Sequence, residues 1–180
     1  MEVLGILSAF GLSASAGLNA YIPLLVVALL AKFTNLIHLS SPWDALASWW
    51  IIGLLIVLSL IEFFADSTPA INHVNDIIQT FVRPTAGAIA FAASANILTD
   101  VSPILSLACG LFVAGGVHAV KSAVVRPTVT ATTAGVGNLP MSILEDITSS
   151  LVSIISVLVP ILVVVFVILM IGIIISIRGD

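Results

Sequence analysis

Ionisable side chains are concentrated in a few short stretches of this chain, although the chain as a whole is very apolar. The densest stretch spans residues 62–84 and carries three carboxylates, a histidine and an arginine; smaller groups follow at residues 118–126 and 145–146. A charge at the centre of a bilayer costs ~2.5–3.5 kcal/mol on insertion scales, so such groups must pair, contact water or bind a ligand. The candidate substrate- or ion-binding residues are Glu62, Asp66, His73, Asp76, Arg83, His118, Lys121, Arg126, Glu145 and Asp146.

This set of side chains suits the transport of a small anion or an anionic headgroup. It combines five carboxylates with three permanent cations and two histidines, for a formal charge of −2 when the histidines are neutral. Arg83 and Arg126 can each bind an oxyanion bidentately. The histidines and carboxylates can take up and release protons near neutral pH. The leading hypothesis is therefore a small transporter, coupled to protons or to another ion, with a polar site near the midplane of the membrane.

Two other functions fit the same residues. Glu62 and Asp66 are four residues apart and His73 and Asp76 are three apart, spacings that allow a shared cation, so a divalent-cation or proton channel or transporter stays open and the metal unknown. Alternatively, buried ion pairs hold together a membrane scaffold that transports nothing. We expect no enzyme, because the sequence has no Walker loop, HExxH or nucleophile elbow. We also expect no cofactor, since only His73 and His118 could ligate a haem and nothing else supports one.

The composition is that of an integral membrane protein. Of 180 residues, 60% are hydrophobic and 8% are charged, and mean hydropathy is +1.29; soluble domains carry about 25% charged residues. Five Lys and Arg in all form no basic patch for nucleic acid. The expected partners are the lipid bilayer, a small ion or anionic substrate, and further copies of the chain, because small residues recur every four positions between Gly5 and Gly17 and favour close helix packing.

The apolar runs predict an all-α, polytopic helical bundle with discontinuous or re-entrant helices. A first helix is expected over residues 3–32, with a kink near Asn19, and a second over residues 44–66. Proline can begin a helix or interrupt one. We therefore predict a short helix from Pro69 that breaks at Pro84, a second break at Pro127, a loop over residues 128–138, a helix beginning at Pro140, and a final span over residues 151–177.

The chain is predicted to be one membrane domain, residues 1–180, containing two pseudo-repeated units. Residues 1–43 form an N-terminal helix and loop, residues 44–97 the first unit and residues 102–178 the second. The repeat is visible when Pro69 and Asp76 are placed over Pro140 and Asp146. Paired interrupted segments in corresponding positions are typical of transporter sites.

Several motifs resemble those of a known family. They begin with Gly11-Leu-Ser-Ala-Ser-Ala-Gly-Leu-Asn-Ala-Tyr-Ile-Pro and with Glu62-Phe-Phe-Ala-Asp, and they continue through Val-Asn-Asp-Ile-Ile-Gln-Thr-Phe-Val-Arg-Pro to His118-Ala, Arg126-Pro and Ser142–Asp146. In these motifs the chain resembles a group of small, mainly bacterial integral membrane proteins described as domain of unknown function 4126. The resemblance implies a bacterial cytoplasmic (inner) membrane protein and supplies no activity.

Overall fold

The computed structural model describes residues 2–35, 37–95 and 102–158, and for residues 2–4, 69, 70, 72 and 73 it describes the backbone alone. The described chain is an all-α membrane protein, confirming the predicted class. The helices, in chain order, are α1 (Glu2–Leu18), α2 (Ile22–Phe33), the 3₁₀ helix η1 (Trp43–Ala47), α3 (Trp49–Ser67), α4 (Pro69–Ala95), α5 (Pro103–Val120), the π-helix η2 (Lys121–Val125), α6 (Arg126–Thr133) and α7 (Asn138–Leu158).

Three helical segments of the described chain are long and apolar enough to cross a membrane. They are Trp49–Ser67, Pro103–Thr133 and Asn138–Leu158. Large apolar side chains cover their outer faces, Phe112 being 76% exposed, as expected where lipid rather than protein surrounds a helix. At one end, Lys32 lies over the ring of Trp49, 4.8 Å from its centroid, and Trp50 is 90% exposed. Tryptophans grouped at one end of a span are typical of a membrane–water interface.

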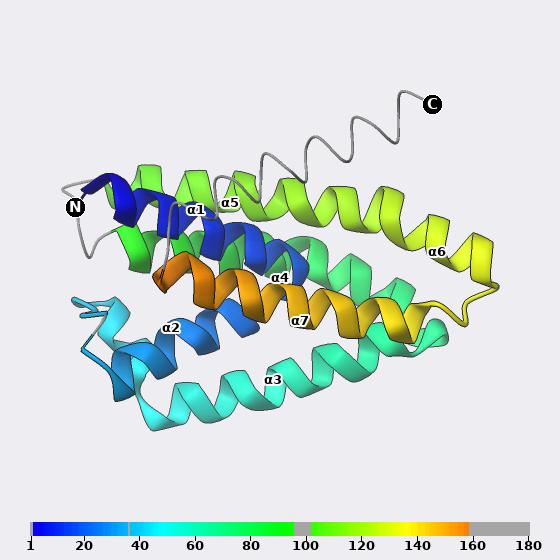
Figure 1. The fold of residues 1–180 in the computed structure, drawn as a ribbon, viewed down its shortest axis with the longest axis horizontal. Helices are drawn as coiled ribbons and strands as arrows, with labels where there is room; N and C mark the ends of the chain where they lie inside the picture. Colours follow the sequence, from blue (N-terminus) through cyan, green and yellow to red (C-terminus); the bar gives the residue numbers. More distant parts are fainter. Residues whose placement is uncertain (1, 36, 96–101, 159–180) are drawn as a thin grey trace.

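Helices α1 and α2 differ from the others in length and course. They occupy one end of the molecule and run antiparallel, so that the joint between them lies about halfway along the bundle (Figure 1). With 12 residues, α2 is roughly 18 Å long, much less than the ~30 Å hydrocarbon core of a bilayer. The sequence placed a kink near Asn19; the structure ends one helix at Leu18 and begins another at Ile22.

Small residues allow α1, α4 and α5 to pack closely. An added Cβ at Gly87 would collide with Ala114 of α5, and one at Gly110 would collide with the backbone of α4 at Gly87. The hydroxyl of Ser13 donates a hydrogen bond to the Gly110 carbonyl at 2.7 Å. The small-residue stripe of α1 is thus used inside the chain, and the predicted homo-oligomer stays a prediction.

Replacing Gly110 by alanine is expected to destabilise the bundle by about 1–3 kcal/mol, because the new methyl group meets backbone atoms that cannot move aside easily. Gly116, on the same helix, is the matched control: a Cβ there has nothing within 4 Å, and alanine is favoured over glycine in a helix by about 1 kcal/mol. Thermal unfolding in detergent compares the two variants. Equal melting temperatures would contradict the close contact.

The predicted helix breaks at Pro84 and Pro127 are wrong. Helix α4 is 27 residues long and continues through Pro84. The proline ring lies towards Gly115 of α5. The Thr85 hydroxyl donates to the Phe81 carbonyl at 2.7 Å, a local hydroxyl contact of the kind that lets helices at membrane depth tolerate proline. Pro127 follows the wide π turn of η2, which joins α5 to α6 without a break.

The other predicted helix boundaries agree in part with the structure. A helix begins at Pro69 as predicted, and α7 begins two residues before Pro140. The expected loop over residues 128–138 is wrong in its first half, which is helical to Thr133; the turn that follows has Ala134 and Gly135 at positive φ. No discontinuity occurs between Pro69 and Ala95. Most of the final span lies outside the described residues, and the two-unit repeat stays a prediction.

Candidate functional site

Six charged side chains meet inside the bundle, and we call them the charged cluster. Helix α3 supplies two carboxylates near its C-terminus, α4 an arginine in its interior, η2 and α6 a cation each, and α7 the third carboxylate. Every member is at most 5% exposed, which is unusual for residues that are rarely buried unless paired. The members are Glu62, Asp66, Arg83, Lys121, Arg126 and Glu145, with a formal charge of zero.

Asp66 is the centre of the charged cluster. Its Oδ2 accepts from Arg126 at 2.5 Å, from Arg83 at 3.0 Å and from Lys121 at 3.3 Å. Its Oδ1 accepts from the Asn75 amide at 2.6 Å. Three cations on one oxygen form the kind of charge-assisted donor set that binds oxyanions.

A second set of hydrogen-bond donors surrounds the Glu62 carboxylate. Its Oε1 accepts from Arg83 Nε at 3.0 Å and from the same guanidinium's terminal nitrogen at 2.8 Å. Its Oε2 accepts from the backbone N–H of Ala20 at 3.1 Å, just before the start of α2. A helix N-terminus carries partial positive charge and free N–H groups, so it favours an anion at this position.

Glu145 completes the charged cluster from α7. Its Oε2 contacts Lys121 and Arg126, both at 2.8 Å. Its Oε1 is buried and has no hydrogen-bond partner among the described residues. Glu145 is therefore held through one oxygen, whereas all the carboxylate oxygens of Glu62 and Asp66 accept at least one donor.

The π-helix η2 sets the direction of two of the cations. In an α-helix, residues four apart share a face, so His118, Ser122 and Arg126 would lie together. In η2 the Arg126 N–H bonds instead to the carbonyl of Lys121, five residues earlier. Lys121 and Arg126 consequently reach the same oxygen of Asp66. Such π turns are frequent at functional sites.

The joint between α1 and α2 is polar and lies against the charged cluster. Lys121 Nζ donates to the Leu18 carbonyl at 2.7 Å. Asn19 Oδ1 accepts from the N–H groups of Tyr21 and Ile22, both at 3.0 Å, and its amide donates to Asp146 at 2.9 Å. Free backbone groups at the joint are thus satisfied by side chains, which interrupted helices at membrane depth require.

Asn19→Ala is expected to lower stability by about 0.5–2 kcal/mol, because the N–H groups that begin α2 lose their acceptor. Asn35→Ala, at an exposed position beyond α2, is the matched control and should change stability little. Thermal unfolding in detergent is the measurement. If Asn19→Ala has the same melting temperature as the wild type, the joint does not depend on this cap.

His118 is buried beside the charged cluster in a defined tautomer. Arg83 can only donate, so the 3.2 Å contact from its guanidinium makes Nδ1 of His118 the acceptor. The proton then lies on Nε2, which is 3.3 Å from the Thr80 hydroxyl. His118 is neutral in this arrangement and adds no charge to the charged cluster.

Asp76 and Asp146 lie at the edge of the charged cluster. Asp76 is 3.9 Å from Arg126 with its side chain 18% exposed, and Asp146 contacts Asn19 rather than a cation. The side chain of His73 is outside the described residues. Sequence reasoning omitted Asn75, although Asn75, Gln79 and Arg83 recur every four residues and are all buried on α4; that spacing is a signal that could have found it.

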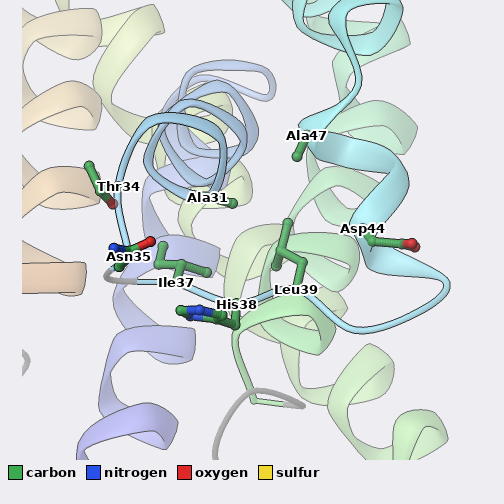
Figure 2. Close-up of a pocket in the computed structure, with 8 residues that line it drawn as sticks. All are labelled: Ala31, Thr34, Asn35, Ile37, His38, Leu39, Asp44 and Ala47. Carbon is green, nitrogen blue, oxygen red and sulfur yellow. The ribbon is translucent and has the colours of Figure 1, made fainter.

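A shallow pocket of about 250 Å³ lies elsewhere, between the end of α2 and η1. Figure 2 shows His38, Leu39 and Asp44 around it. It is lined by residues 31–47 and includes no member of the charged cluster. Across the described residues, no three His, Cys, Asp or Glu side chains are grouped as metal ligands. The donors that converge in the charged cluster are cationic, and cationic donors suit an anion.

Comparison with known proteins places the chain in a family without assigning an activity. No curated protein and no solved structure gives a significant match. The family model described as "Domain of unknown function (DUF4126)" matches residues 6–178, which is nearly the whole chain and includes every member of the charged cluster. The chain therefore belongs to the DUF4126 family, as its motifs indicated.

Proposed function

We propose that this protein is a small transporter that moves an anion, or the anionic headgroup of a lipid, through the charged cluster. The observation that carries the proposal is the set of donors around Asp66 and Glu62: three cations and the N-terminus of α2, buried together. An arrangement of this kind binds oxyanions. Here the protein's own carboxylates occupy it, and an anion from outside would exchange with them.

The position of the charged cluster supports transport. It lies against the joint of two helices, the second too short to cross a bilayer. We infer that α1 and α2 form a re-entrant hairpin, entering from one side and returning to it, with the joint near the midplane. Half-helices that end at the midplane are how many transporters present helix termini to substrate. We place the protein in the cytoplasmic membrane of a bacterium.

Reconstitution in liposomes tests the proposal. Two probes share the phosphodiester monoanion: radiolabelled dimethyl phosphate for a free anion and a fluorescent phosphatidylglycerol for a headgroup. We expect the wild type to raise the flux of at least one probe well above protein-free liposomes. The double variant Arg83→Gln with Glu62→Gln, which removes one charge of each sign, should abolish that flux, and so should Asp76→Asn. Lys32→Gln, at the far end of α2, is the control and should leave it unchanged.

A scaffold is the second candidate, favoured by one observation: every charge in the charged cluster has an opposite charge within 3.3 Å. Buried ion pairs of this kind can fix a structure without binding a ligand. The two candidates differ in what they predict for the wild type. A scaffold predicts no flux of either probe in the wild type and no change in melting temperature when a phosphodiester is added.

A further inference from the structure

We infer that Asp76, Gln79 and Glu145 bind one Na⁺ ion at the edge of the charged cluster, and that this ion crosses the membrane together with the anion. The inference rests on the proposed function and deepens it, because it names the coupling ion and the side chains that bind it.

Three buried carboxylate and amide oxygens have no hydrogen-bond partner among the described residues. They are Asp76 Oδ1, Gln79 Oε1 and Glu145 Oε1. The residues Gln79 and Glu145 are only 3% and 4% exposed. Buried acceptors are nearly always satisfied, so an acceptor oxygen without a donor indicates a place for a water molecule or an ion.

The three oxygens belong to neighbouring side chains. Asp76 and Gln79 are three residues apart on α4, so they share a face of the helix, with Cβ atoms about 5–6 Å apart. Arg126 links Asp76 to Glu145, since one terminal nitrogen of its guanidinium is 3.9 Å from Asp76 Oδ1 and the other is 2.8 Å from Glu145 Oε2. The side chain of Asp76 is 18% exposed, so an ion from outside can reach this edge of the charged cluster.

The charge at this edge is negative. When Asp76 is counted with the charged cluster, four carboxylates face three cations. Asp146, which is held by Asn19 rather than by a cation, adds a further negative charge. The excess favours a cation, because buried carboxylates without a matching positive charge are costly.

Na⁺ suits these oxygens better than a proton or a divalent metal does. A proton on a carboxyl group makes one O–H donor, so it serves two oxygens at most, whereas hard cations bind several carboxylate and amide oxygens at once. A divalent ion would place two charges close to Arg126 and Lys121. In the described part of the chain, no three His, Cys, Asp or Glu side chains are grouped to bind such a metal.

Na⁺ binding also prepares the anion site, through Arg126. This guanidinium contacts Asp76, Glu145 and Asp66. A sodium ion on Asp76 and Glu145 offsets their charge, so they hold Arg126 less strongly and its donors become available to an oxyanion. The oxyanion in turn brings the negative charge that Na⁺ balances. Each ligand therefore raises the affinity of the protein for the other.

The wild-type protein in detergent gives the first test. At constant pH and ionic strength, exchanging N-methyl-D-glucamine chloride for NaCl should raise the melting temperature, because an ion that binds only the folded protein stabilises it. The sodium NMR signal should broaden when the protein is added. If the melting temperature is the same in the two salts, or if lowering the pH without Na⁺ produces the whole rise, the inference is wrong.

Variants of Gln79 separate binding of the ion from general effects of salt. Gln79→Leu removes a ligand oxygen without changing the charge, so it should raise the Na⁺ concentration needed for half of the effect by about 10–100-fold. Gln79→Glu keeps an oxygen there and should retain the response. Asp44→Asn, an exposed carboxylate of η1, is the matched control and should respond as the wild type. An unchanged response in Gln79→Leu contradicts the site.

The coupling is measured in liposomes with the two phosphodiester probes. Na⁺ is about tenfold more concentrated outside, and equal potassium with valinomycin holds the membrane potential at zero. With one Na⁺ per anion, the wild type should concentrate dimethyl phosphate in the lumen, or the fluorescent phosphatidylglycerol in the inner leaflet, about tenfold. Wild-type flux that ignores the Na⁺ gradient overturns this inference and leaves the proposed function standing. No flux of either probe overturns both.

Discussion

Replacing Arg83 by alanine is expected to destabilise the protein by about 3–5 kcal/mol, because it leaves charges buried without their partner. Arg83 is 0% exposed and contacts Glu62, Asp66 and His118 at once. Without it, Glu62 keeps only the N–H of Ala20. The free energy of unfolding in mixed micelles is the measurement, with Lys32→Ala, a cation on the outside of the bundle, as the matched control.

The double variant Arg83→Gln with Glu62→Gln separates charge pairing from packing. Both glutamines approximate the lost volumes and can hydrogen-bond to each other, and the pair removes no net charge. Most of the stability lost in Arg83→Ala should return, since exchanging a whole buried pair for neutral groups is far less costly than breaking it. A single variant as stable as the wild type would show that water reaches these charges.

Replacing Asp66 by alanine should turn the charged cluster into an open anion site. The three cations that contact Oδ2 would then exceed the remaining carboxylates by one charge. We expect a loss of about 3–5 kcal/mol, followed by rescue when formate or acetate is added, because a ligand at 100 times its dissociation constant restores about 2.7 kcal/mol.

The control for this rescue is formamide, which has the shape of formate and no charge. The wild type in formate is the second control, since Asp66 already fills the position. Rescue is read as a melting temperature that rises with formate concentration in Asp66→Ala alone. Equal responses to formate and formamide would mean that the donors around Asp66 do not select an anion.

The class of the protein and the members of the charged cluster could be predicted from the sequence, for one physical reason. Where apolar residues are so abundant, each charge must be satisfied inside the protein, so a list of the charges is nearly a list of the site. That argument found Glu62, Asp66, Arg83, Lys121, Arg126 and Glu145. It also included Asp146, which contacts the amide of Asn19.

The course of the backbone was less predictable. Helix breaks were predicted at Pro84 and Pro127, but proline removes only one N–H, and neighbouring hydroxyls or a wide turn can compensate for that loss. The interruption that does exist, at residues 19–21, has no proline in it; Pro23 follows as an ordinary residue of the first turn. The sequence signal for this interruption was Asn19 among small residues. The side chains that contact the backbone there, Glu62 and Lys121, are distant in sequence.

The π turn of η2 makes the length of this segment matter more than its side chains. Between Lys121 and Arg126 the residues Ser122, Ala123, Val124 and Val125 are half-buried or exposed, so they tolerate exchange for other residues of similar polarity. Their number is tied to the π turn. Wound as an ordinary α-helix, the same five-residue step would rotate Arg126 by about 100° from its present direction, away from Asp66. A homologue without the π turn should therefore carry three residues rather than four between the two cations.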